Sequence, residues 1–148
     1  MILRTLTHHR DGVQYDLRET ICTLAISADA QWLVTADCAN RIYVVNMDSL
    51  KLHAALPTFS SRHTALAFHE SSDNIIVACA DNTVYAYHVD TKQVREITRD
   101  TNSRLTHLLR RRKEKIIGIL SNPSRPHTII LWGLGYLSEL DIRQVMIF

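Results

Sequence analysis

Apolar runs of five to seven residues alternate with short polar segments over most of the chain. ICTLAIS, WLVTADC, RIYVVNM and LHAAL lie within residues 21–56, and HTALAFH, NIIVACA, TVYAYHV and VREIT lie within residues 63–98. Short runs rich in β-branched and aromatic residues and bounded by turn-forming residues are typical of β-strands. Asn40 and Asn82 lie between the second and third run of each set and tolerate the left-handed backbone of tight hairpins. The pattern therefore predicts two antiparallel meanders of four strands.

The two sets are copies of one repeat. Residues 20–57 align without a gap with residues 62–99, at an offset of 42 residues. The identical pairs are Leu24 and Leu66, Ala25 and Ala67, Ala36 and Ala78, Asn40 and Asn82, Tyr43 and Tyr85, and Asp48 and Asp90. A period of about 40 to 45 residues is that of one β-propeller blade. The second run of each copy is apolar on both faces, as expected for an inner strand covered on both sides.

The rest of the chain is divided on the same pattern. The six predicted parts are an N-terminal edge segment at 1–19, a blade at 20–57, a blade at 62–99, a basic insertion at 100–114, a partial blade at 115–132 and an atypical tail at 133–148. Residues 2–7 are expected to form an edge strand, and residues 115–122 and 128–132 the two strands of the partial blade. No third strand is expected in the tail, where the spacing over residues 138–148 fits a helix.

The predicted fold is therefore all-β, built from WD-repeat-like blades that are four-stranded antiparallel meanders. It is an incomplete propeller of about two and a half blades, whereas propellers close with about four to eight. Because a blade buries its apolar faces against its neighbours, we expect the isolated chain to be weakly stable or to self-associate.

Charge, cysteine content and hydropathy limit the kinds of function that the chain can have. The 148 residues carry a net charge of +2, so any electrostatic recognition must be local. Three cysteines with no close pairing favour free thiols in an intracellular, reducing compartment. The longest apolar stretch, residues 75–80, is too short for a membrane span, and no signal peptide is expected. Only four glycines are present, and no phosphate-binding loop is found.

The titratable residues do not form a recognisable catalytic or metal-binding motif. The eight histidines show no H-x-x-x-H or H-E-x-x-H spacing, and no G-x-S-x-G motif marks a nucleophile. The aspartates recur between predicted strands, where turn capping explains them. We therefore predict no catalytic residue, no metal, no cofactor and no small-molecule substrate.

One local charge cluster is a candidate for contacting RNA. It consists of Arg104, Arg110, Arg111, Arg112, Lys113 and Lys115. Such a cluster can neutralise phosphates, and each contact adds affinity and salt dependence. The alternative is a solvated loop at the edge of the protein, since no stacking aromatic residues are interleaved with the cations.

Four segments of the chain resemble the cirhin family of WD-repeat proteins, that of the U3 small nucleolar RNA-associated protein 4. They are LAISADAQWLVTAD, IYVVNMDSLKLHAALP, HTALAFHESSDNIIVACADNTVYAYHVDTKQ and, more faintly, NPSRPHTIILW. The resemblance covers residues 24–132. Proteins of this family carry two propellers, and the four segments resemble late blades of the second one. The chain departs from regular WD repeats, because neither copy has a Gly-His or a Trp-Asp signature, and the tail after Trp132 does not follow the family.

The resemblance implies a non-catalytic scaffold of the nucleus and nucleolus, in small-subunit processome assembly and pre-18S rRNA processing. Its implied partners are other processome subunits of the transcription-associated subcomplex, together with pre-ribosomal RNA. Two alternatives stay open: a general WD-repeat interaction adaptor, for example one that presents substrates to a ubiquitin ligase, and an enzyme with a site grafted on the propeller.

Overall fold

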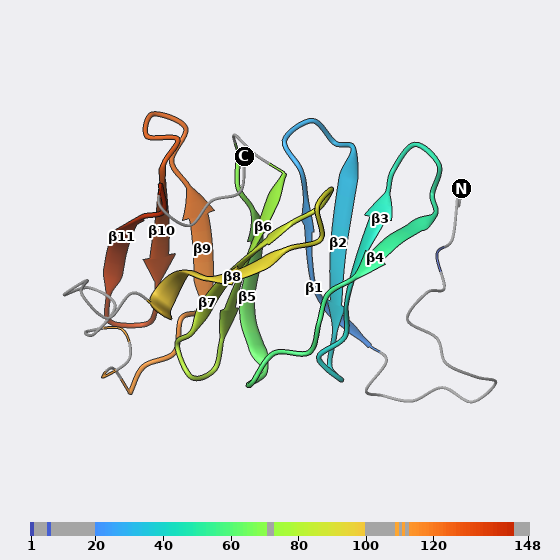
Figure 1. The fold of residues 1–148 in the computed structure, drawn as a ribbon. Helices are drawn as coiled ribbons and strands as arrows, with labels where there is room; N and C mark the ends of the chain where they lie inside the picture. The colour runs from blue at the N-terminus through green and yellow to red at the C-terminus, as the bar shows by residue number, and fades with distance from the viewer. Residues whose placement is uncertain are drawn as a thin grey trace. The chain divides into compact units, whose positions relative to one another are not determined.

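The computed structural model describes residues 1, 6, 20–70, 73–99, 109, 111 and 113–143, and they form two compact units, Met1–Thr58 and Phe59–Phe148. Each unit is built from antiparallel β-sheets (Figure 1). Over these residues, no helix has the length and apolar character that a membrane span requires.

The first unit contains one four-stranded sheet. Its strands, in spatial as well as chain order, are β1 (Ile21–Ile26), β2 (Trp32–Asp37), β3 (Ile42–Asn46) and β4 (Leu52–Ala55). Every pair of neighbours is antiparallel. The four strands predicted for the first copy of the repeat are confirmed.

The second unit contains two sheets. The first is the meander of β5 (His63–Phe68), β6 (Asn74–Cys79), β7 (Val84–His88) and β8 (Val94–Glu96), which leads into the 3-10 helix η2 (Ile97–Arg99). The second has the order β11-β10-β9 and consists of β9 (Gly118–Ser121), β10 (Thr128–Trp132) and β11 (Leu137–Asp141). The four strands predicted for the second copy are confirmed, and so is the all-β fold of propeller-type meanders.

The backbone irregularities repeat along with the sequence. A register shift falls between Ile21 and Thr23 in β1 and recurs 42 residues later between His63 and Ala65 in β5. Asn40 has φ 67° and Asn82 has φ 61°, as predicted for these asparagines.

A second left-handed pair was not expected from the sequence. Leu50 and Lys92 both have φ 56° in the turns before β4 and β8. Their N–H groups donate to the carbonyls of Asn46 and His88, respectively, at 2.8 and 2.9 Å. The turn imposes this backbone conformation on Leu50 and on Lys92 alike. The residue type at these positions therefore does not indicate a left-handed conformation.

The tail corrects one prediction. Residues 137–141 form β11, which pairs with β10 from Thr128↔Asp141 to Trp132↔Leu137, so a third strand is present and the helix expected from residue 138 onward is wrong there. The β10–β11 turn is closed by the Gly133 N–H, which donates to the Tyr136 carbonyl at 3.0 Å. Leu140 is buried while Glu139 and Asp141 are exposed, which is the two-residue period of a strand. Residues 144–148, and residues 2–5 and 7 of the expected edge strand, lie outside the described residues.

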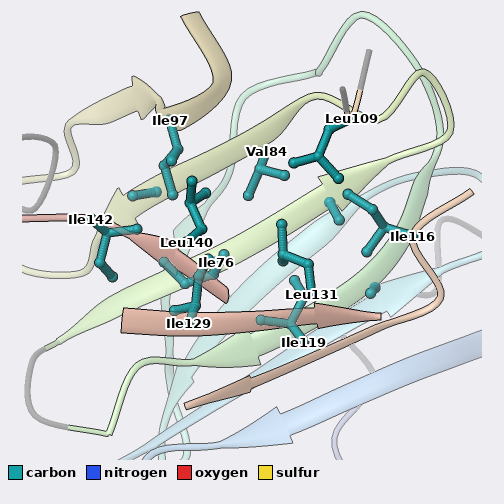
Figure 2. Packing of buried hydrophobic residues seen from close by; sticks show 13 residues of the cluster. Ile76, Val84, Ile97, Leu109, Ile116, Ile119, Ile129, Leu131, Leu140 and Ile142 are labelled. Carbon is teal, nitrogen blue, oxygen red and sulfur yellow. The ribbon is translucent and has the colours of Figure 1, made fainter. Parts of the chain in front are cut away.

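Apolar side chains from the two sheets of the second unit pack into one cluster (Figure 2). One side comes from the β5–β8 meander and η2: Ala65, Ile76, Ala78, Val84, Ala86 and Ile97. The other comes from the last sheet and the segments beside it: Leu109, Ile116, Ile119, Ile129, Leu131, Leu140 and Ile142. All are at most 8% exposed, so neither sheet face is left in water.

Replacement of a side chain in this cluster tests the packing. Leu131 is 0% exposed, and we expect Leu131→Ala to lower the free energy of unfolding by about 2–5 kcal/mol, because it removes apolar contacts and leaves a cavity. Chemical denaturation of the purified chain measures the change. Leu134→Ala is the matched control, since Leu134 is 90% exposed, and equal losses from both substitutions would contradict the packing described here.

Candidate nucleic-acid interface

The structure describes three of the six cations of the predicted RNA-contacting cluster. Arg111, Lys113 and Lys115 are all exposed. Arg104, Arg110 and Arg112 lie outside the described residues, so the cluster as a whole stays a prediction. In the part of the chain that the structure covers, no ion pair neutralises these three side chains.

Two buried apolar residues anchor the segment that carries these cations. Leu109 is 1% exposed and Ile116 is 0% exposed, and both belong to the cluster between the two sheets of the second unit. Figure 2 shows both side chains directed into that cluster. The exposed cations therefore lie between two fixed points of the chain.

Asn82 holds the same segment by hydrogen bonds. Its side-chain N–H groups donate to the carbonyl oxygens of Leu109, at 3.1 Å, and of Glu114, at 2.9 Å. Its Oδ1 accepts the N–H of Ile116 at 3.0 Å. Asn82 is only 3% exposed, so the three bonds satisfy polar groups that would otherwise be costly to bury.

The β10–β11 turn supports the segment from another direction. The Gly135 N–H donates to the Glu114 carboxylate at 3.0 Å. A Cβ added at Gly133 would lie 2.9 Å from the carbonyl oxygen of Lys115, so the turn needs glycine to approach that closely. Among the described residues of this segment, Leu109, Glu114 and Ile116 are thus held by hydrogen bonds to their own unit, and the side chains of Arg111, Lys113 and Lys115 are exposed to solvent.

Sequence reasoning found the cations and missed the residue that positions them. The sequence pattern predicts only a turn at Asn82, because the groups that it bonds lie 27 to 34 residues away in the chain. Its identity with Asn40 across the repeat is the one signal that marked it.

A second feature of this unit is a small cavity between the β5–β6 and β9–β10 turns. It measures about 110 Å³ and is lined by His69, Glu70, Ser121, Asn122, Pro123 and Pro126. The Glu70 N–H donates to Ser121 Oγ at 3.1 Å, which ties the two turns together. Burial lowers the pKa of His69, and the charge of His127 lowers it further. Among the described residues, no group of three His, Cys, Asp or Glu side chains is placed to hold a metal ion.

Removal of the Asn82 side chain tests its role in holding the basic segment. Asn82→Gly keeps a residue that adopts positive φ but removes all three hydrogen bonds, so we expect the free energy of unfolding to fall by about 1–3 kcal/mol. We also expect faster hydrogen exchange at the Ile116 amide. Asn40→Gly, with the same backbone conformation 42 residues earlier, is the control and should leave that amide unchanged. Unaltered exchange in Asn82→Gly would show that the segment is held by other contacts.

The buried imidazole predicts an acid-sensitive stability. Because the folded pKa of His69 is lowered, the unfolded chain binds this proton first, and stability falls as the pH drops below about 6.5 towards the folded pKa. Urea unfolding at a series of pH values measures the loss. His69→Gln should remove most of this dependence, and His127→Gln should reduce it, whereas the neighbouring Glu70 acts in the opposite direction. A pH profile that neither substitution changes would assign the effect to other groups.

Comparisons with known proteins place this arrangement in a family. The human protein named U3 small nucleolar RNA-associated protein 4 homolog is 32% identical over 114 residues, which cover 76% of this chain and 17% of that protein. Ribosomal RNA-processing protein 9 of Saccharomyces cerevisiae is 23% identical over 141 residues, covering 94% of this chain and 24% of that protein. The chain thus spans about a fifth of the length of these relatives. No profile of a known protein family matches it.

The structural comparison agrees on the fold. The β-propeller domain of Cps50 (Swd1) from Myceliophteria thermophila superposes with a TM-score of 0.62 at 14% identity, over 84% of this chain and 36% of that one. That domain supports WD-repeat propeller architecture, and the sequence relatives supply the closer assignment. The chain belongs to the family of the U3 small nucleolar RNA-associated protein 4, to which the cirhin-like segments pointed.

Proposed function

We propose that this chain acts as a non-catalytic scaffold in the assembly of the small-subunit processome and in pre-18S rRNA processing. The observation that carries the proposal is the match to proteins whose names associate them with U3 small nucleolar RNA and with ribosomal RNA processing. The propeller meanders suit this role, since their turns and sheet edges offer binding surfaces on a rigid frame. The site of action is the nucleolus.

The anchored basic segment is the part of the chain that we propose contacts pre-ribosomal RNA. Arg111, Lys113 and Lys115 are exposed, and in the sequence they lie between Leu109 and Ile116, which are buried and hydrogen-bonded to Asn82. Anchoring the chain at Leu109 and at Ile116 reduces the entropy that is lost when cations are ordered on phosphates. Arg104, Arg110 and Arg112 extend the same charge along the sequence.

Other processome subunits of the transcription-associated subcomplex are the proposed protein partners. The repeat copies at 20–57 and 62–99 are the proposed blades, and residues 115–132 with β11 are a third, three-stranded one. No small molecule or membrane is part of this function.

Recovery of precursor rRNA tests the role. The tagged chain is expressed in eukaryotic cells, purified at mild salt and probed for precursor rRNA, with a same-sized fragment of an unrelated propeller as control. We expect more precursor rRNA to be recovered with this chain than with the control. Equal recovery with both would overturn the processome role and favour a general interaction adaptor.

Charge reversal tests the RNA contact separately. Arg111→Glu, Lys113→Glu and Lys115→Glu are combined and compared with Lys51→Glu, Lys92→Glu and Arg95→Glu, three exposed cations from other parts of the chain. Binding of a single-stranded precursor rRNA segment is measured against salt concentration. Three lost phosphate contacts should lower the slope of log affinity against log salt by roughly 2, and the control variant should change it less. Equal changes in both variants would show that the segment is no more than a solvated loop.

A further inference from the structure

Trp132 is a large aromatic residue that the fold leaves partly in solvent. It is the last residue of β10, which lies between β9 and β11 (Figure 1), and it is paired with Gly118 in β9 and with Leu137 in β11. The residue is 39% exposed although its backbone is paired on both sides. The exposure therefore belongs mainly to the indole ring.

Gly118 determines where the ring lies. A Cβ added at Gly118 would fall 2.0 Å from both Nε1 and Cε2 of Trp132, so the indole occupies the space in which any other residue would place its side chain. The ring thus lies against β9 and is restricted before any ligand binds. A rigid aromatic group loses little conformational entropy when a ligand binds to it.

The exposed cations of the basic segment lie at the same end of the sheet. The Trp132 carbonyl accepts the N–H of Ile117 at 2.9 Å, and a Cβ added at the next residue, Gly133, would lie 2.9 Å from the carbonyl oxygen of Lys115. The backbone of Lys115 therefore passes beside the end of β10. Lys113 and Lys115 are both exposed, so the fold brings exposed cations and an exposed ring together from distant parts of the sequence.

The acidic side chains of β11 lead away from Trp132. Glu139 and Asp141 lie beyond the residue that is paired with Trp132, and both carboxylates are bound by arginines. Glu114, the carboxylate that lies among the cations in the sequence, accepts a backbone N–H of the β10–β11 turn at 3.0 Å. The described charges beside the ring are therefore net positive.

This combination favours a nucleobase over a protein surface as the partner of the ring. Proteins that bind single-stranded nucleic acid combine cations, which contact phosphates, with aromatic side chains on which bases stack. The centres of protein–protein interfaces are instead depleted of lysine. Trp132 with Lys113 and Lys115 has the composition of the first kind of site.

We infer that Trp132 stacks on a base of the RNA whose phosphates Lys113 and Lys115 contact. The inference rests on the proposed RNA contact and adds to it the class of ligand, an unpaired base of single-stranded RNA, since such bases are free to stack on a side chain. Every base has a π-face, so the ring selects no particular one. Stacking adds affinity that salt does not screen, whereas affinity from phosphate contacts falls as salt rises.

Salt titration of RNA binding tests the stack, using the full chain and a short single-stranded RNA. We expect Trp132→Leu to weaken binding by about 5- to 150-fold, as for the loss of one stacked base, and to leave the slope of log affinity against log salt unchanged. Trp132→Phe keeps a ring and should lose less. Leu120→Ala is the matched control, because Leu120 lies on the same side of β9 as Gly118, is 56% exposed and is farther from the cations. Far-UV circular dichroism checks that every variant keeps its sheets.

An abasic oligomer of the same length shows whether the ring contacts a base. It keeps the phosphates and lacks the stacking surface, so the wild type and Trp132→Leu should bind it equally. Trp32→Phe leaves Trp132 as the only tryptophan of the chain. In that variant we expect the RNA to quench the tryptophan fluorescence and the abasic oligomer to leave it unchanged.

The outcomes separate this inference from the proposed function. If Trp132→Leu binds the RNA as tightly as the wild type, while charge reversal of the exposed cations lowers the salt slope, the RNA contact stands and the stack is overturned. Equal losses from Trp132→Leu and Leu120→Ala, or equal losses of RNA and abasic binding in Trp132→Leu, would also overturn the stack and leave the ring to a protein contact. A wild type that binds neither oligomer would overturn both proposals.

Discussion

Burial of apolar sheet faces is the interaction on which the rest of this structure depends. A four-stranded meander has two faces and no interior of its own, so its apolar residues leave water only when another sheet covers them. In the second unit, Ile76 and Ala86 of the meander are buried in one cluster with Ile129 and Leu131 of the last sheet. At about 25 cal/mol for each Å² of apolar surface removed from water, this packing outweighs any single hydrogen bond in the unit.

The basic segment depends on that packing. Leu109 and Ile116 enter the same cluster, and Asn82 can bond to the segment because the meander places its turn beside it. Asparagine meets two requirements of position 82. It tolerates a φ of 61°, and its side-chain amide both donates and accepts hydrogen bonds. Glycine would meet the first requirement only.

The sequence was sufficient to predict the strands of both meanders and their period. Short apolar runs bounded by turn-forming residues carry that signal, and Asn40 and Asn82 mark the tight turns. It was misleading at residues 137–141, because LSELDI fits a helical spacing as well as a strand, and only pairing with β10 decides between them. It was silent on the contacts of Asn82 with Leu109 and Glu114, since a contact across 27 or 32 residues leaves no local pattern. The cations of the candidate RNA site were visible as charge, but the anchoring of Leu109 and Ile116 on either side of Arg111, Lys113 and Lys115 was not.

The repeat preserves backbone geometry more strictly than side-chain chemistry. At one turn Asp37 accepts the N–H groups of Ala39 and Arg41 and pairs with the Arg41 guanidinium at 2.7 Å. The residue 42 positions later is Cys79, a thiol whose pKa burial raises to about 11, yet the turn closes with the same backbone hydrogen bonds. Because the same main-chain hydrogen bonds close both turns, the side chain at this repeat position is free to differ between the two copies. Asn82 shows the consequence, since a residue common to both copies positions, in the second, the segment that carries the exposed cations.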